Sequence, residues 1–143
     1  VCHVGGFFCF CYVLKLLIER SLSRVAFGKP IINLGGNRER IADFRIAIDQ
    51  ARLLTLYAAW KLDTVGALGA MIEISSIKVV APNVLQQVCD EAIQIHGGAG
   101  VSRDFPFTGF FSIARCIRIA DGPDAVHRGL IARFELLKYP NSK

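Results

Sequence analysis

The chain has 143 residues, of which 52% are hydrophobic and 20% charged, a composition that fits one globular domain and excludes a disordered or low-complexity chain. The net charge is +5, but the basic residues are spread singly among apolar ones, so we expect a solvated surface and no nucleic-acid partner. Five cysteines occur without a CxxC pair, which favours a reducing compartment and argues against a metal site or a disulfide framework. Cys89 and Cys116 lie on apolar helical faces, and both are predicted to be buried.

The first 15 residues, VCHVGGFFCFCYVLK, form an atypical apolar leader that starts without methionine. Residues 1–14 are too few to span a bilayer, so no transmembrane segment is predicted. A signal peptide would have a basic start and a small-residue cleavage site, and neither is clear. We expect the chain to begin partway through a longer protein, with residues 16–143 forming the domain.

Apolar residues at intervals of three and four predict helices along the rest of the chain. Residues 16–27 are expected to be the end of a helix, and residues 28–37, GKPIINLGGN, a loop. A long helix is predicted over residues 38–66, ended by glycines, and its inward stripe is Ile41, Phe44, Ile48, Ala51, Leu54, Ala58, Leu62 and Val65. A second long helix is predicted over residues 70–96; Pro82 lies inside it and is expected to bend it.

Two shorter helices are predicted to complete the chain, over residues 108–121 and 124–138, with Gly122-Pro123 breaking the helical pattern between them. The inward residues expected of the last helix are Val126, Leu130, Ile131, Phe134 and Leu137. Strand-like alternation is absent from the sequence. Long helices joined by short loops, each with one apolar stripe, predict an all-α fold, an antiparallel four-helix bundle.

Two of the breaks between helices contain residues that favour chemistry. Residues 94–100 read QIHGGAG; two glycines let a backbone approach a ligand closely, and free N–H groups favour anions, although a plain helix cap is the alternative. Asp121 stands beside Gly122-Pro123, where its carboxylate could act as a base or simply form part of a turn. Histidines such as His96 more often cap helices or lie on surfaces than catalyse.

Four blocks of the sequence together resemble one family. SRVAFGKPI, IADFRIAIDQARLLTLYAAWKLD, IKVVAPNVLQQVCDEAIQIHGGAGVSRDFP and RIADGPDAVH occur in the order, and at the distances, of the C-terminal helical domain of acyl-CoA dehydrogenases. The resemblance extends from about Glu19 to Leu137. The ADGPD-x-VH form is especially similar to the branch that contains acyl-CoA dehydrogenase family members ten and eleven.

The resemblance implies FAD as cofactor and assigns roles to individual positions. Arg24 matches an arginine that contacts the FAD pyrophosphate of a neighbouring subunit, and a forked, permanently charged guanidinium suits phosphate. Asp121 matches the position of a catalytic glutamate, and Gly122 lies at the substrate. The remaining cofactor-binding positions are Phe27, Gln94, His96, Gly97, Gly98 and Pro123. No metal is implied.

The implied reaction is α,β-dehydrogenation of an acyl-CoA thioester, in which Asp121 removes the α proton and the electrons later pass to electron-transferring flavoprotein or another acceptor. A homodimer or homotetramer and a mitochondrial or peroxisomal location are also implied. Aspartate is one C–C bond, about 1.5 Å, shorter than the family's usual glutamate. Pro123-Asp124-Ala125 replaces the family's Thr-x-Gln.

Two other functions remain open. The chain could be a bundle without chemistry, kept for oligomerisation or scaffolding, or a basic helical module for nucleic acid or membrane. Without the other domains of the family the chain forms one wall of a flavin site, so it is expected to be inactive alone, and apolar faces that normally meet those domains would make it associate.

Overall fold

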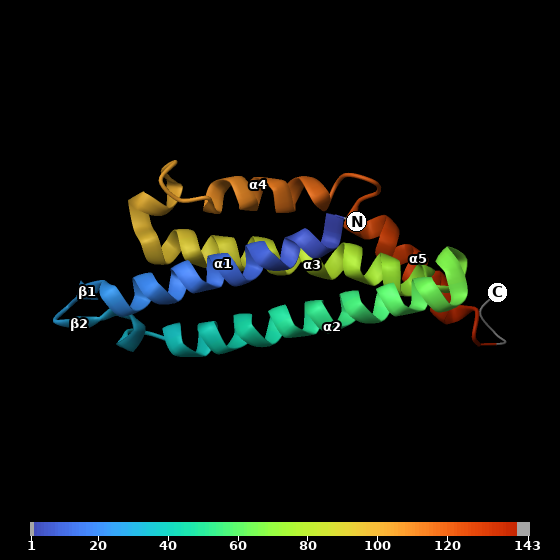
Figure 1. The fold of residues 1–143 in the computed structure, drawn as a ribbon, viewed down its shortest axis with the longest axis horizontal. Helices are drawn as coiled ribbons and strands as arrows, with labels where there is room; N and C mark the ends of the chain where they lie inside the picture. Colours follow the sequence, from blue (N-terminus) through green and yellow to red (C-terminus); the bar gives the residue numbers. More distant parts are fainter. Residues whose placement is uncertain (1, 140–143) are drawn as a thin grey trace.

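The computed structural model describes residues 2–139, and α-helices account for most of them. Three long helices lie side by side: α1 (Cys2–Ser23), α2 (Asn37–Gly69) and α3 (Met71–His96). A shorter helix, α4 (Phe107–Ile117), covers α3, and α5 (Asp124–Leu136) packs across α3 at the end away from the hairpin (Figure 1). Successive bundle helices run in opposite directions, which confirms the predicted all-α antiparallel bundle.

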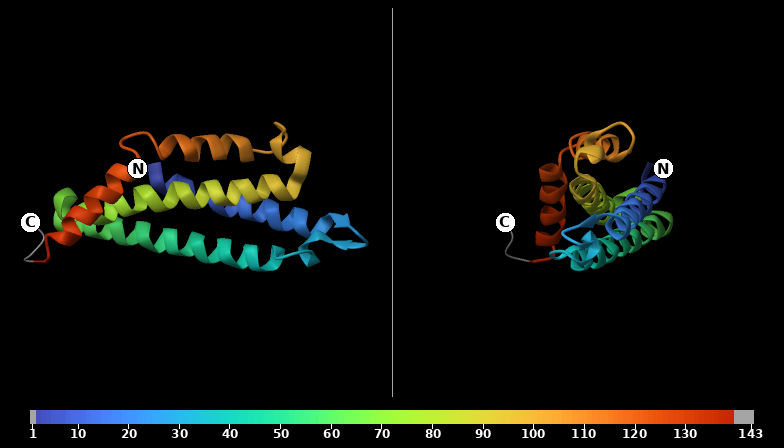
Figure 2. Two further views of the ribbon diagram at one scale, coloured as in Figure 1. Left: turned by 180° about the vertical axis from the view of Figure 1, so that it is seen from behind. Right: turned by 90° about the vertical axis from the view of Figure 1, so that its left-hand side faces the viewer.

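The helix α3 is the centre of the molecule, because it contacts α1, α2, α4 and α5. The end-on view in Figure 2 shows the other helices grouped around it. Its buried stripe packs against apolar residues of the neighbouring helices; the core includes Val13, Leu17, Ile48, Ala51, Val84, Val88, Cys89, Ala92, Phe107 and Ala114. The helix continues through Pro82 to the predicted end at His96. Along residues 2–139, no helix combines the length and apolar character needed to cross a membrane.

The first helix includes most of the predicted leader. No break in α1 marks the expected boundary after residue 15, and Phe10, Val13 and Leu14 are buried in the core. At its other end α1 stops at Ser23, so the prediction that the helix continues to residue 27 is wrong. The chain instead forms a short antiparallel hairpin from β1 (Val25–Ala26), where helix was predicted, and β2 (Lys29–Pro30), where a loop was predicted.

Both turn residues of the hairpin have a left-handed backbone, which glycine adopts readily but phenylalanine rarely does. Ala26 pairs with Lys29, and between them Phe27 and Gly28 have φ of 51° and 77°. Positive φ at both central residues is typical of two-residue hairpin turns, whose twist matches that of the strands. A short 3₁₀ helix, η1 (Ile31–Asn33), then leads into α2.

Some predicted inward residues are exposed. On α2 these are Leu62 and Val65, and on α5 they are Val126, Phe134 and Leu137. Because α5 packs mainly against α3, only one side of it is covered. Cys89 is fully buried as predicted, and burial raises the pKa of its thiol to about 12. Cys116 is exposed, so its predicted burial is wrong.

Candidate functional site

The predicted cofactor-binding residues Arg24 and Phe27 lie at the end of the bundle that contains the hairpin, which we call the hairpin end. The backbone of Arg24 is fixed on both sides, by hydrogen bonds from its N–H to Arg20 O (3.0 Å) and from the Ile31 N–H to Arg24 O (2.9 Å). Within residues 2–139 the guanidinium has no ion-pair or hydrogen-bond partner, and it is exposed. Phe27 is 94% exposed at the tip of the turn. The structure thus presents an unpaired cation and an aromatic ring together.

The double glycine ends α3 at the same hairpin end (Figure 1). Gly97 has φ of 63°, and its N–H caps the helix by donating to the carbonyls of Ile93 and Gln94, so this N–H is not left for a ligand. A Cβ added to Gly97 or Gly98 would meet no atom within 4 Å. The surface over these two residues is therefore open, and Gln94 is exposed beside it.

Gly100 must be a glycine because of the packing around it, although no prediction was made for this residue. A Cβ there would lie 2.6 Å from the carbonyl oxygen of Ile93 and 2.8 Å from its Cα, which is closer than real Cβ atoms approach. Gly100 belongs to the 3₁₀ helix η2 (Gly97–Val101), which folds back on the end of α3. All three glycines of the GGAG run stand out in the sequence, but only the fold shows that Gly100 is the one whose position leaves no room for a side chain.

His96 is directed into the protein, with only 6% of its surface exposed. Its Nδ1–H donates to Ala92 O at 2.8 Å, and its ring lies 4.5 Å from that of Phe105 and 4.6 Å from that of Phe107, centroid to centroid. Burial lowers the pKa of His96, against the effect of the Ala92 hydrogen bond, and the charge of Arg20 lowers it further. The imidazole is thus a neutral packing group beneath the glycines.

Asp121 lies in the loop between α4 and α5, because α4 ends at Ile117, four residues before its predicted end. Asp121 has φ of 54° and Gly122 has φ of 99°, so two successive residues adopt left-handed backbone. The carboxylate of Asp121 is exposed and has no ion-pair or hydrogen-bond partner in the described part of the chain. Pro123 is also exposed, and it is the N-cap residue of α5.

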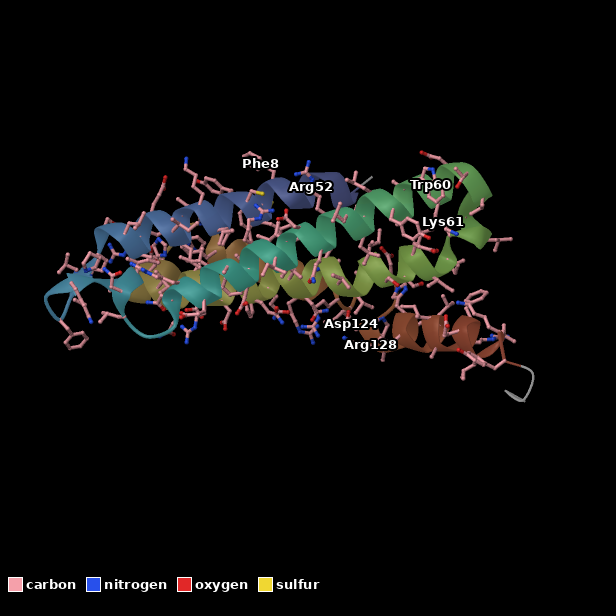
Figure 3. The ribbon with its side chains drawn as sticks, turned by 90° about the horizontal axis from the view of Figure 1, so that it is seen from below. Phe8, Arg52, Trp60, Lys61, Asp124 and Arg128 are labelled. Atoms are coloured by element: carbon pink, nitrogen blue, oxygen red, sulfur yellow. The ribbon has the colours of Figure 1, made fainter. Side chains whose placement is uncertain are left out.

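A buried polar network, which the sequence analysis missed, supports this loop. Asp124 is 7% exposed, and its Oδ2 accepts hydrogen bonds from Arg118 Nε (2.8 Å) and Asn83 Nδ2 (3.2 Å). Arg118 Nη1 also donates to Gln86 Oε1 at 2.7 Å. Figure 3 shows Asp124 between α3 and the start of α5. The only sequence signal for this network was an arginine and an acid on either side of Gly-Pro.

Replacing Asp124 by asparagine should remove a pH-dependent part of the stability. Burial opposes the charge of Asp124, but hydrogen bonds from Asn83 and Arg118, with the charges of Arg118 and Arg128, outweigh burial and lower its pKa from the ordinary 3.8. The ion pair therefore stabilises the fold above the unfolded-state pKa, and this stability is lost as the pH falls through the lower folded-state pKa. We expect urea titrations from pH 6 downward to show an acid loss of stability that is smaller in Asp124→Asn.

The exposed Asp63→Asn serves as the control for this titration, because it removes an acid from α2 without touching the network. An Asp124→Asn protein whose free energy of unfolding follows the same pH profile as the native chain would contradict the assignment.

The two groups of predicted residues do not meet within one chain. The loop of Asp121 touches α3 at Lys78, whose ammonium lies 3.2 Å from Gly122 O, whereas Gly97 lies at the end of the same helix. About 28 Å of helix, at 1.5 Å per residue, separates Lys78 from Gly97. Arg24, Phe27, Gln94, Gly97 and Gly98 form one group, at the hairpin end, and Asp121, Gly122 and Pro123 form the other.

Comparisons with known proteins identify the family of the chain. The family model described as "Acyl-CoA dehydrogenase, C-terminal domain" matches residues 8–136. Acyl-CoA dehydrogenase family member 11 of Rattus norvegicus is 47% identical over 124 residues, which are 87% of this chain and 16% of the rat protein. The chain therefore spans about one sixth of the length of that relative.

Solved structures have the same fold. A Mycobacterium abscessus chain assigned to the acyl-CoA dehydrogenases is 60% identical, with a TM-score of 0.91 over 94% of this chain and 33% of its own. An FAD complex of PigA is 26% identical, with a TM-score of 0.82 over 90% of this chain and 33% of its own. On the family match, which covers most of the chain, and on the shared fold, the chain belongs to the acyl-CoA dehydrogenase family and corresponds to its C-terminal helical domain.

Proposed function

We propose that this chain acts as the C-terminal domain of an FAD-dependent acyl-CoA dehydrogenase, called the holoenzyme below, which converts an acyl-CoA to a trans-2-enoyl-CoA in fatty acid β-oxidation. The observation that supports this most directly is the exposed, unpartnered carboxylate of Asp121, held in a left-handed loop where the family has its catalytic base. Asp121 accepts the α proton of the thioester, and the small Gly122 beside it leaves room for the acyl group.

The hairpin end fits the phosphate groups of FAD. Arg24 offers an unpaired guanidinium, and the open surface over Gly97 and Gly98 lets a ligand approach the main chain. Gln94 and Phe27 are exposed on the same end, whereas the buried ring of His96 supports the glycines from below. When bound, FAD would be the oxidant: it would accept the hydride from the β carbon while Asp121 takes the α proton. The 28 Å separation agrees with Arg24 serving the FAD of a neighbouring subunit.

A turnover assay of the holoenzyme tests the proposed function directly. Acyl-CoA thioesters of several chain lengths are added to the yellow protein with electron-transferring flavoprotein or an artificial dye as acceptor, and trans-2-enoyl-CoA is measured. We expect bleaching of the flavin and formation of the enoyl product with at least one thioester. A holoenzyme that binds FAD but is bleached by none of them would refute the proposed reaction.

Arg24→Ala should weaken FAD binding by the holoenzyme. A hydrogen bond to a charged group contributes about 1.5–3 kcal/mol, so the dissociation constant should rise on the order of 10- to 100-fold. Flavin absorbance after gel filtration and fluorescence titration of the apoprotein would measure this loss. Arg52→Ala removes another exposed arginine, on α2 (Figure 3), and should leave FAD affinity unchanged. Equal effects of the two substitutions would contradict the role of Arg24.

The exposed apolar face of α2 favours a homodimer or homotetramer. Ile46, Leu53, Tyr57 and Trp60 lie at helical spacing and are 46–66% exposed, and the rings of Tyr57 and Trp60 stack with centroids 5.8 Å apart. The same face would serve the second candidate function, a non-catalytic oligomerisation module. FAD content and turnover of the holoenzyme distinguish the two functions. We further propose a mitochondrial or peroxisomal location, which fluorescent fusions would test.

A further inference from the structure

Lys78 is a buried cation in the first third of α3. It is 8% exposed, although lysine is rarely buried without partners, and it lies in an otherwise apolar stretch between Ile77 and Val79. Its Nζ donates to the carbonyl oxygens of Ile117 (2.5 Å) and Gly122 (3.2 Å). One ammonium therefore contacts both the last residue of α4 and the residue that follows Asp121, which lie 39 and 44 positions after Lys78 in the sequence.

The loop that Lys78 contacts has an uncommon backbone conformation. Left-handed backbone is uncommon outside glycine, although aspartate adopts it more readily than most residues, and Asp121 has φ of 54°. Such conformations persist only where surrounding contacts determine them. Two contacts come from α5 and its first residue: the Asp124 N–H donates to Arg118 O (3.2 Å), and His127 Nε2–H donates to Asp121 O (3.2 Å).

The contacts from α5 join the loop to the helix that comes directly after it in the sequence. The contact from Lys78 joins the loop to α3, the central helix of the bundle. The ammonium also lies at the C-terminus of α4, where carbonyls lack intrahelical partners and a cation is favoured. Lys78 thus ties both ends of the loop to α3, and the side chain of Arg118, which donates to Gln86 of α3, adds a further tie at the start of the loop.

We propose that Lys78 is a positioning residue: by holding the carbonyls of Ile117 and Gly122, it fixes the loop of residues 118–123 and thereby the place of the Asp121 carboxylate. That this position serves proton removal rests on the proposed function. The mechanical part of the inference, that Lys78 holds the loop in place, does not.

The mechanical part is tested on the 143-residue chain by amide hydrogen exchange. Lys78→Met keeps an unbranched buried stem without a donor, Lys78→Arg keeps a cationic donor, and Lys15→Met is the control, at a lysine whose side chain is 67% exposed on α1. We expect exchange in residues 118–124 to become at least about tenfold faster in Lys78→Met, relative to residues 43–58 of α2. Lys78→Arg should restore much of the protection, and Lys15→Met should match the native chain.

Unchanged exchange in Lys78→Met would overturn the proposal. So would an equal loss of protection in α2 and the loop, or a protein that does not fold, because Lys78 would then be a general stability residue. These outcomes do not depend on whether the holoenzyme is active, so a failure of the proposed function is recognised separately, by an inactive native holoenzyme.

The catalytic part is tested by kinetics of the holoenzyme. Misplacement of a reacting group by about 1 Å can cost about 100-fold in rate, so kcat of Lys78→Met should fall about 100-fold. KM for the acyl-CoA should change less than about threefold and FAD should stay bound, because the lost interaction matters in the transition state. Recovery of kcat in Lys78→Arg would support positioning, and a native kcat in Lys78→Met would overturn it.

Discussion

Asp121→Asn in the holoenzyme is expected to lower kcat about 10²- to 10⁴-fold while FAD stays bound. This range is the usual contribution of a positioned general base, and asparagine keeps the size of aspartate without accepting a proton at neutral pH. The main chain should tolerate the change, because asparagine adopts the left-handed backbone of Asp121 (φ 54°) about as well as aspartate. Steady-state kinetics and the visible spectrum of the flavin would measure the two quantities.

Asp121→Glu and Asp63→Asn are the controls for this prediction. Asp121→Glu restores the length of the family's usual base and should stay active, whereas Asp63→Asn removes an exposed acid on α2 and should have native kinetics. An Asp121→Asn enzyme with native kcat would show that the base lies elsewhere, and loss of FAD from it would show that the loop supports the cofactor.

Phe107→Ala should destabilise the fold by about 3–5 kcal/mol, the usual cost of truncating a large buried aromatic residue. Phe107 is fully buried, its ring stacks on that of Phe105 with centroids 5.3 Å apart, and it contacts His96 beneath the double glycine. Truncation would leave a cavity under the hairpin end. Urea unfolding of the chain, followed by circular dichroism, would measure the change.

Phe27→Ala is a matched control, because it truncates the same side chain where it is 94% exposed. It should change the free energy of unfolding by no more than about 0.5 kcal/mol. Similar destabilisation by the two substitutions would contradict the assignment of Phe107 to the core.

The buried face of a helix could be predicted from the sequence where two neighbouring helices cover that face. The stripe from Ile41 to Ala58 is at least partly buried, because α1 and α3 pack on that part of α2. The same spacing in α5 predicted five inward residues, yet Val126, Phe134 and Leu137 are exposed. Periodicity shows which residues share a face, but tertiary packing decides how much of that face is covered.

The parts of the candidate site that could be predicted are those formed by unusual residues within one short segment of the sequence. Two glycines after a helix and an acid before Gly-Pro stand out in one segment, and the structure confirms both breaks. The supports of the site were not predictable, because Lys78 meets Gly122, and Asn83 meets Asp124, only after two helices have packed. The burial of His96 was not predictable either, because Phe105 and Phe107 cover its ring only in the folded protein.

The length of α3 between Lys78 and Gly97 has a genetic consequence. If the hairpin end of one chain binds the flavin and the Asp121 loop of a second copy supplies the base, every active site combines residues from two copies of the chain. An allele defective in Arg24 and an allele defective in Asp121 would each lower the activity when present alone. In a mixed oligomer, the intact hairpin end of one product faces the intact loop of the other, so the two alleles would complement each other in a diploid cell.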